Sequence, residues 1–249
     1  MSYIIHPLKN GSCVIAGNHA FLGGNPTERY PYNLYLWLIK GREEPILVDT
    51  GLKDVEEMNR GAAHVLAEPI VQDADETAQS QLAKFGIGAE EIGWVFITHL
   101  HFDHVNELGI YKNARIVVSR RGLEAATAFP GWKGTWAPWE VLDGLTKVWK
   151  DRVVAIDDTE VLPGLRTMWL GGHTPCSQAV VLQTRIGSTA IAGDTVSLYA
   201  NIERNIPVGV ADDYDQCLRA MIKLKRMADV IIPSHDPEVL RRYPNGAIG

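Results

Sequence analysis

The stretch Thr98-His99-Leu100-His101-Phe102-Asp103-His104 decides the fold, and it follows directly on the apolar run at residues 94–97. A short apolar run bounded by polar residues predicts a buried strand, so the histidines begin where that strand ends. Loops at strand ends are where α/β architectures usually place chemistry. Three imidazoles and one carboxylate within six residues are hard to explain as core packing. We therefore interpret the segment as a metal-binding loop.

The spacing of these side chains indicates two metal positions. Alternate residues of an extended segment point the same way, so His99 and His101 can reach one ion together. The turn that follows can bring Asp103 and His104 toward a second position. Neutral imidazole with carboxylate oxygen suits Zn²⁺, although iron or manganese can occupy similar ligands. Because chemistry needs an open coordination position, we expect three or four protein ligands per ion.

Three further polar residues, outward along the chain, share this context of an apolar strand followed by a turn. His173 follows the run at 165–170, Asp194 follows the run at 188–192, and His235 follows the run at 230–232. The repeated context is more persuasive than any single residue, since a lone histidine is more often a hydrogen-bonded structural residue. These three side chains therefore join the candidate metal site.

The ordered pattern His-x-His-x-Asp-His, then His, then Asp, then His, resembles the metallo-β-lactamase superfamily. Asp49, within Leu47-Val48-Asp49-Thr50-Gly51, matches that superfamily's first motif, an aspartate that braces the metal loop. The resemblance extends over residues 33–238. It implies an α+β fold, a four-layer αββα sandwich, with the site at one edge between the sheets. We expect a single metallo-hydrolase domain over residues 1–249.

The resemblance also implies two Zn²⁺ ions per chain, with other divalent metals as alternatives. The implied ligands are His99, His101 and His173 for one ion, Asp103, His104 and His235 for the other, and Asp194 as the bridge. Two ions about 3.5–4 Å apart can share a water and lower its pKa, and the bridging hydroxide then attacks a carbonyl or phosphoryl centre. Asp103 is our candidate for moving the proton afterwards. Asp49 is expected to orient one of the metal ligands without binding a metal ion itself.

Within the superfamily, the chain looks like the N-acyl homoserine lactonase-like branch, which includes pyridoxolactonase-like enzymes. The supporting residues are the run at 99–104, Ser234-His235-Asp236 and the run at 193–207. That resemblance implies hydrolysis of a lactone or a related cyclic ester. Lactonases of the branch place a tyrosine three residues after the bridging aspartate, where its hydroxyl helps the substrate carbonyl. This chain has Ser197 there, so Tyr199 is our candidate, with ordinary packing as its alternative.

Other functions stay open for the same set of residues. A cyclic amide or imide, or an organophosphate, could be hydrolysed at the same metals. The same metal-activated water can attack each of these bonds, and the shape of the pocket determines which substrate binds. A mononuclear iron enzyme like the persulfide dioxygenases of this superfamily would use fewer ligands. A non-enzymatic metal-binding protein is a third alternative. Because all seven ligands are present, the sequence favours a two-metal enzyme.

An aromatic-rich segment between Arg121 and Trp149 is the candidate substrate pocket. Loops that carry tryptophan near a metal edge can line an apolar pocket. The predicted pocket residues are Phe129, Trp132, Trp136 and Trp139. Interrupting glycines and prolines argue against a regular helix through the segment. A satellite hydrophobic cluster and a dimer contact are the alternatives. We expect a small-molecule substrate with an apolar or aromatic part, and a homodimer is possible.

Composition bounds the remaining possibilities. The net charge of −6 over 249 residues disfavours a nucleic-acid binder, which usually shows a basic face. The sequence has no run of 18 apolar residues and no signal-peptide pattern at its start, so we predict a cytoplasmic protein without a membrane span. The three cysteines predict neither a disulfide framework nor a Cys-x-x-Cys zinc site. Cys13 and Cys217 are expected to be small apolar residues.

Hydrophobic periodicity predicts about a dozen short strands and few helices, which favours sheets packed face to face with helices outside. The predicted strands lie at 3–5, 13–15, 33–39, 45–48, 94–97, 115–118, 152–156, 165–170, 178–182, 188–192 and 230–232. Apolar residues three and four apart predict helices at 76–85 and 212–227.

Overall fold

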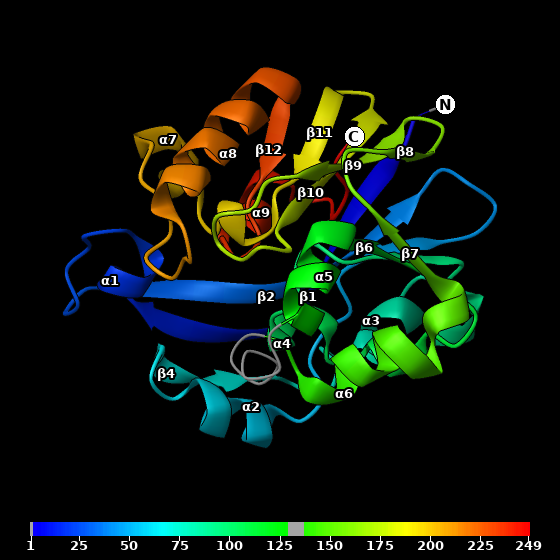
Figure 1. The fold of residues 1–249 in the computed structure, drawn as a ribbon, viewed down its shortest axis with the longest axis horizontal. Coiled ribbons are helices and arrows are strands. Elements are labelled where there is room, and N and C mark those ends of the chain that lie inside the picture. The colour runs from blue at the N-terminus through cyan, green and yellow to red at the C-terminus, as the bar shows by residue number, and fades with distance from the viewer. Residues whose placement is uncertain (1, 129–136) are drawn as a thin grey trace.

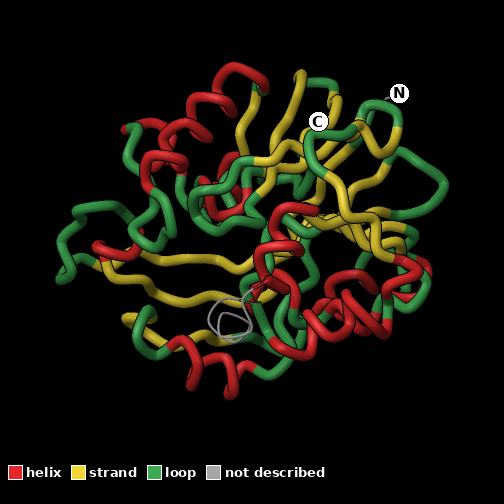
Figure 2. The backbone as a smooth tube through the Cα atoms, viewed as in Figure 1, coloured by secondary structure: helices red, strands yellow, loops and turns green. Residues whose placement is uncertain are grey.

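The computed structural model describes residues 2–128 and 137–249 and arranges them in four layers. Two sheets pack face to face, and helices cover the outer face of each (Figure 1). Coloured by secondary structure, the backbone shows the strands gathered inside and the helices outside (Figure 2). The predicted α+β, four-layer αββα sandwich is confirmed.

The first sheet contains seven strands among the described residues. Their order is β4 (Leu66–Val71), β1 (Ile4–Ala16), β2 (Arg29–Lys40), β3 (Ile46–Val48), β5 (Trp94–Phe96), β6 (Arg115–Ser119) and β7 (Val153–Ile156). Strands β3, β5, β6 and β7 run parallel, whereas β4, β1 and β2 are antiparallel. The loop after β3 therefore leaves the sheet beside the loop after β5.

The second sheet contains five strands in the described part of the chain. Their order is β12 (Val230–Ile232), β11 (Gly187–Ile191), β10 (Gln178–Thr184), β9 (Leu165–Trp169) and β8 (Glu160–Leu162). Strands β11 and β12 are parallel, and β10 is antiparallel to both β9 and β11. Consequently β9, β11 and β12 all end at the same edge of the sheet.

Alternation along the strands separates the core layers. On β2, Trp37 and Ile39 pack toward the second sheet, whereas Leu36 and Leu38 pack toward the helices outside the first sheet. Period-two burial of this kind is expected for a strand with an apolar layer on each face. The inter-sheet layer is completed by buried side chains of both sheets: Phe96, Val117, Val180, Leu182 and Ile191.

Helices cover both outer faces and the ends of the sandwich. Outside the first sheet lie α3 (Ala78–Ala83), α5 (Arg120–Ala128) and α6 (Trp139–Asp143), and outside the second lie α7 (Tyr199–Arg204) and α8 (Tyr214–Met227). The remaining helices are α1 (Gly17–Ala20), α2 (Val55–Ala62), α4 (Phe102–Val105) and α9 (Glu238–Arg242). A π-helical turn at Gly144–Val148 follows α6, and 3-10 turns occupy Ala89–Glu91, Leu108–Ile110, Lys150–Arg152 and Gly193–Thr195. Within the described ranges, no helix has the length and apolar character needed to cross a bilayer.

Local differences from the predicted elements have physical reasons. Helix α3 begins after Thr77 and α8 after Asp213, because these side chains accept N–H groups of the first turn and act as N-caps. The runs predicted as separate strands at 3–5 and 13–15 form one strand, β1. A change of register between Lys9 and Gly11 lets β1 continue past the apparent break.

Candidate metal centre

The seven predicted ligands meet at one edge of the sandwich. They come from the segments that follow β5, β9, β11 and β12, with Asp103 and His104 on α4 and Asp194 in a 3-10 turn. These segments meet because the four strands end at the same edge of the sandwich. The side chains form two groups, each with ligand atoms within 4.8 Å of one another: His99, His101, His173 and Asp194 in the first, and Asp103, His104 and His235 in the second.

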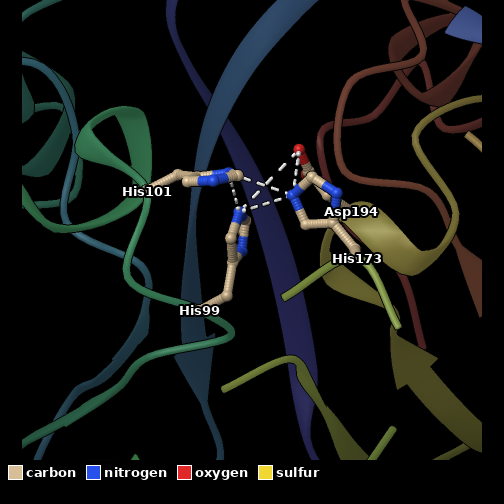
Figure 3. A group of neighbouring side chains, drawn as sticks. All are labelled: His99, His101, His173 and Asp194. Carbon is tan, nitrogen blue, oxygen red and sulfur yellow. Dashed lines mark hydrogen bonds and ion pairs between the residues drawn. The ribbon is translucent and has the colours of Figure 1, made fainter. Parts of the chain in front are cut away.

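In the first group, three ring nitrogens converge on one point (Figure 3). Nδ1 of His101 lies 3.0 Å from Nε2 of His99 and 3.0 Å from Nε2 of His173. Burial lowers the pKa of all three imidazoles, that of His101 to about 3. The rings are therefore neutral near pH 7 and offer the unprotonated nitrogens that a metal ion requires.

In the second group, imidazoles are interleaved with carboxylates. Nε2 of His104 lies 3.4 Å from Oδ2 of Asp103 and 3.3 Å from Oδ1 of Asp194. Burial by itself would lower the pKa of His104, but the carboxylates of Asp103, Asp49 and Asp194 outweigh it and raise that pKa well above its ordinary value. The pKa of His235 is also raised, because Asp194 and Asp103 together outweigh burial.

Asp194 faces both groups. Its Oδ2 lies 3.6 Å from Nε2 of His173, and its Oδ1 lies 2.9 Å from Nε2 of His235. Burial would raise the pKa of Asp194, but His235, His104 and His99 together hold it well below the usual range. The hydroxyl of Ser234 donates to Oδ1 at 2.7 Å. The ionised carboxylate thus faces a ring of each group with a different oxygen.

Asp49 braces the loop that carries four of these ligands. It follows β3 with a left-handed backbone, φ 59°, which aspartate tolerates better than most residues. Its carboxylate accepts the backbone N–H of Thr98 at 2.8 Å and the Thr98 hydroxyl at 2.9 Å. It also lies 2.8 Å from Nδ1 of His104. The arrangement turns Nε2 of His104 toward the centre.

Backbone carbonyls orient two other rings. Nδ1 of His173 lies 2.6 Å from the carbonyl oxygen of Val210, and Nδ1 of His235 lies 3.0 Å from that of Asn33. Because a carbonyl can only accept, each Nδ1 carries a proton, and Nε2 is the nitrogen of each ring that faces the other ligands.

Glycines let the ligand turns come close to their supports. Gly172 has φ +84°, and a Cβ there would meet the backbone nitrogen of Cys217 at 2.6 Å. Gly193 has φ +55°, and a Cβ there would meet Cβ of Thr98 at 2.9 Å. Each glycine directly precedes a ligand, so these turns require a residue without a side chain.

The donor set fits two divalent cations. Nε2 of His104 is buried and has no hydrogen-bond partner among the described residues. A buried polar atom of this kind requires an explanation, and a cation between the imidazoles and carboxylates would supply one. Nitrogen and carboxylate donors are those that Zn²⁺ prefers. The residues of each group could therefore hold one ion, with Asp194 shared.

Tyr199, the sequence candidate for substrate contact, packs elsewhere. Its ring is buried in the layer between the sheets, with the guanidinium of Arg242 3.6 Å from the ring centroid. Burial raises the pKa of its hydroxyl above the ordinary value. α7 begins at Tyr199, and the packing of the ring between the sheets favours the alternative of ordinary packing, while the substrate role stays a prediction.

The predicted pocket wall is only partly described. Phe129, Trp132 and Trp136 lie outside the described residues. Trp139 begins α6 and is 51% exposed, at the surface of the helical layer that covers the first sheet. The pocket role of this aromatic segment stays a prediction.

The sequence analysis missed residues on the strands beneath the centre. Tyr32 and Cys13 are cross-strand partners on β2 and β1. The ring of Tyr32 stacks on the imidazole of His235 with centroids 5.0 Å apart and an interplanar angle of 13°. Burial raises the pKa of the Cys13 thiol to about 12, and the charges of Asp103 and Asp194 contribute to the rise. Cys13 was expected to be a small apolar residue, and it packs in a buried apolar cluster beside Tyr32.

An αββα sandwich with two groups of imidazoles and carboxylates at its edge defines a class of metal-binding proteins. The family model described as the metallo-beta-lactamase superfamily matches residues 30–235. The chain belongs to the metallo-beta-lactamase superfamily.

The chain is also similar to individual proteins and solved structures within this superfamily. An N-acyl homoserine lactonase from Bacillus sp is 26% identical, with 89% of this chain and 86% of the relative covered. A solved N-acyl homoserine lactone hydrolase, with the product N-hexanoyl-L-homoserine at its catalytic metal centre, aligns with a TM-score of 0.82 at 22% identity and covers 97% of both chains. AidC, described as a dizinc quorum-quenching lactonase, aligns with a TM-score of 0.69 at 18% identity over 94% of this chain and 88% of its own. The structural likenesses support the fold.

Proposed function

We propose that this protein is a metal-dependent hydrolase that opens a lactone or a related cyclic ester. The observation that carries the proposal is the position of Asp194, whose two oxygens face two separate groups of ligands. The lactonases among the similar proteins support the choice of substrate class.

Two Zn²⁺ ions are the proposed cofactors, although other divalent metals suit the same donors. His99, His101 and His173 would hold one ion, Asp103, His104 and His235 the other, and Asp194 both. When bound, such ions activate a water for attack and polarise the carbonyl of the substrate. A mononuclear iron enzyme would leave the second group without a purpose, so the geometry favours the hydrolase.

Asp103 is the proposed proton carrier. Burial raises its pKa, but His104 and His235 outweigh burial and keep the carboxylate ionised. In ester hydrolysis, the oxygen of water bonds to the carbonyl carbon, the ring C–O bond breaks, and the leaving alkoxide takes up a proton. A carboxylate at the edge of the second group can accept the proton of water and pass it to that alkoxide.

A substrate panel with metal analysis tests the proposal. The protein, purified without chelator, is offered an acyl homoserine lactone, an aromatic lactone, a cyclic imide and a phosphotriester, and acid release is followed in a pH-stat. We expect lactone opening, about two metal ions per chain, and loss of turnover with chelator. Turnover of the imide or phosphotriester without the lactones would contradict the substrate class. Bound iron with oxygen consumption would contradict the reaction class.

The finer features of the sequence analysis stay proposals. They are a substrate with an apolar or aromatic part, a possible homodimer and a cytoplasmic location. Aromatic side chains in the segment that contains Trp139 support the first of these.

A further inference from the structure

The solvent-exposed side of α8 carries a stripe of apolar side chains. Nine large apolar side chains are exposed among the described residues, and four of the nine belong to this helix of 14 residues. Three of them lie four positions apart: Tyr214, Leu218 and Ile222, which are 37%, 37% and 50% exposed. Residues four apart are neighbours on one side of a helix, so these side chains form a continuous stripe. Scattered exposed apolar residues are ordinary, whereas a continuous apolar surface is typical of an interaction site.

The stripe does not hold α8 on the protein. Another side of the helix does so, where Ala220, Met221 and Leu224 are buried against the outer face of the second sheet. Figure 1 shows α8 at the outer surface of the molecule, outside that sheet. Substitutions within the stripe are therefore expected to leave the fold intact, and the stripe is open to a partner.

Two charged residues border the stripe, one near each end of α8. Asp215 lies in the first turn and Arg226 in the last. Eleven residues are close to three turns of 3.6 residues, so both side chains lie on the same flank of the helix. Both are exposed, and neither forms an ion pair within the described part of the chain. Arg219, which lies between them, is already bonded to Oε1 of Gln216 at 3.4 Å, away from the stripe. Asp215 and Arg226 are thus available to charges on a partner.

The order of these charges fits a second copy of the same helix that runs in the opposite direction. With a two-fold axis midway between Leu218 and Ile222, Leu218 lies beside Ile222 of the second copy. The same axis sets Asp215 opposite Arg226 of the second copy. A parallel pair would instead set each aspartate against its own counterpart, and like charges at an interface are unfavourable. Antiparallel helices also bring opposite ends of their macrodipoles together. The exposed side of α8 is therefore self-complementary.

A membrane surface suits this helix less well than a second copy does. Helices that lie on membranes are usually basic on their polar side, because most of their lipid partners are anionic. Three aspartates stand at the start of α8 instead, Asp212, Asp213 and Asp215, and the chain as a whole has a net charge of −6. An anionic lipid surface would repel this end of the helix.

We propose that two copies of this protein associate through an antiparallel contact between their α8 helices. The apolar stripe forms the centre of the contact, and an ion pair between Asp215 and Arg226 closes each end. The inference goes beyond the proposed hydrolysis and does not depend on it, because the stripe contains none of the seven candidate ligands.

Sedimentation equilibrium of the protein, purified without chelator, tests the stripe. Wild type should associate reversibly from one chain to two as its concentration rises. Ile222→Glu places a carboxylate in the centre of the contact, and we expect the Kd of the dimer to rise at least about 30-fold. Ile186→Glu is the matched control, because Ile186 is 47% exposed in the turn between β10 and β11. The control should leave the Kd unchanged, and circular dichroism should show the same fold in all three proteins.

A charge exchange tests the antiparallel arrangement. Asp215→Lys and Arg226→Asp, each studied alone, set like charges against each other at both ends, so the Kd should rise about tenfold. In a one-to-one mixture of the two variants, opposite charges meet at both ends, and the dimer should return with a Kd near that of wild type. A merely structural effect of either substitution on its own helix would not be reversed by mixing.

Each outcome decides the proposal. A wild-type protein that remains one chain at every concentration up to its solubility limit would overturn it, and so would a dimer that Ile222→Glu leaves intact. Variants that stay apart when mixed would overturn the antiparallel arrangement. A monomeric wild type that binds vesicles of anionic phospholipid would assign the stripe to a membrane surface instead.

Discussion

The two groups of candidate ligands, which form the two halves of the candidate metal centre, differ in the charge that their histidines are expected to carry. In the first half, burial keeps the imidazoles of His99, His101 and His173 neutral. In the second, the carboxylates raise the pKa of His104 and His235 and so favour the protonated form of these two rings. Neutral imidazoles can bind a metal ion directly, whereas protons on the rings of the second group would compete with an ion for the same nitrogens.

The difference in the pKa of the two sets of histidines comes from the groups that contact the Nδ1 side of each ring. The carbonyl of Val210 fixes His173 and carries no net charge. The carboxylate of Asp49 fixes His104 and also stabilises its protonated form. The contacts at Nδ1 therefore orient the rings in both groups, but they favour a protonated ring only in the second group.

The largest effect should follow removal of a ring from the first half. His101→Ala takes away the nitrogen that lies 3.0 Å from two others, so the first ion loses a ligand. We expect kcat/KM to fall by more than about 10³-fold, or roughly 4 kcal/mol, with an unchanged circular dichroism spectrum. His19→Ala is the control, because His19 bonds the carbonyl of Val65 and stands outside both groups. Near-normal activity of His101→Ala would refute the ligand assignment.

An intermediate effect should be confined to the second half. Asp49→Asn keeps a residue that accepts the left-handed backbone but removes the charge behind His104. We expect affinity for the second ion to fall about 10–100-fold while the first is retained. Competition with a chromophoric chelator measures both constants. Equal weakening of the two ions would contradict the separation of the halves.

Acid should also distinguish the halves. The pKa of His104 and of His235 lies above 6.5 in the folded, metal-free protein, so both are protonated as pH falls toward that value and compete with the second ion. The pKa of His101 is about 3, so its nitrogen stays available well below neutrality. We expect metal content, measured after gel filtration from pH 8 down to about 5.5, to drop first by the second ion. Parallel loss of both ions would contradict this order.

The smallest effect is expected on the stability of the segment that carries His99 and His101, which Cys176 supports. Sγ of Cys176 accepts the backbone N–H of Leu100 at 3.2 Å, between the first two histidines. Cys176→Ala leaves that buried N–H without a partner, which costs about 1–3 kcal/mol in the free energy of unfolding. Cys176→Ser restores an acceptor and should recover part of the loss. Chemical denaturation measures both, and equal stability of the alanine variant and wild type would exclude this role.

The structure brings the seven predicted side chains together, and the sequence could predict this because each of the segments that carry them follows an apolar strand. His173, Asp194 and His235 each follow an apolar strand, and strands that share a direction bring their ends together. The four-layer fold followed from the family resemblance rather than from periodicity. Periodicity alone located most strands but not the pairing that joins two predicted runs into β1.

The substrate side was not predictable in the same way. Tyr199 was chosen because it is near Asp194 in sequence, and its ring packs in the layer between the sheets at the start of α7. Tyr32 reaches the centre because β2 meets the loop of His235, across a separation of about 200 residues. Contacts made by such distant segments leave no spacing signal in a single sequence.

The attachment of His235 to β2 consists of main-chain atoms of Asn33, one N–H and one carbonyl. Any amino acid except proline supplies that pair, so position 33 can drift during evolution without detaching the ligand. The neighbouring residue Tyr32 lies on the same strand, β2. Substitutions of side chains along β2 could therefore change which substrate binds, while the position of His235 and the proposed metal ligands stay the same.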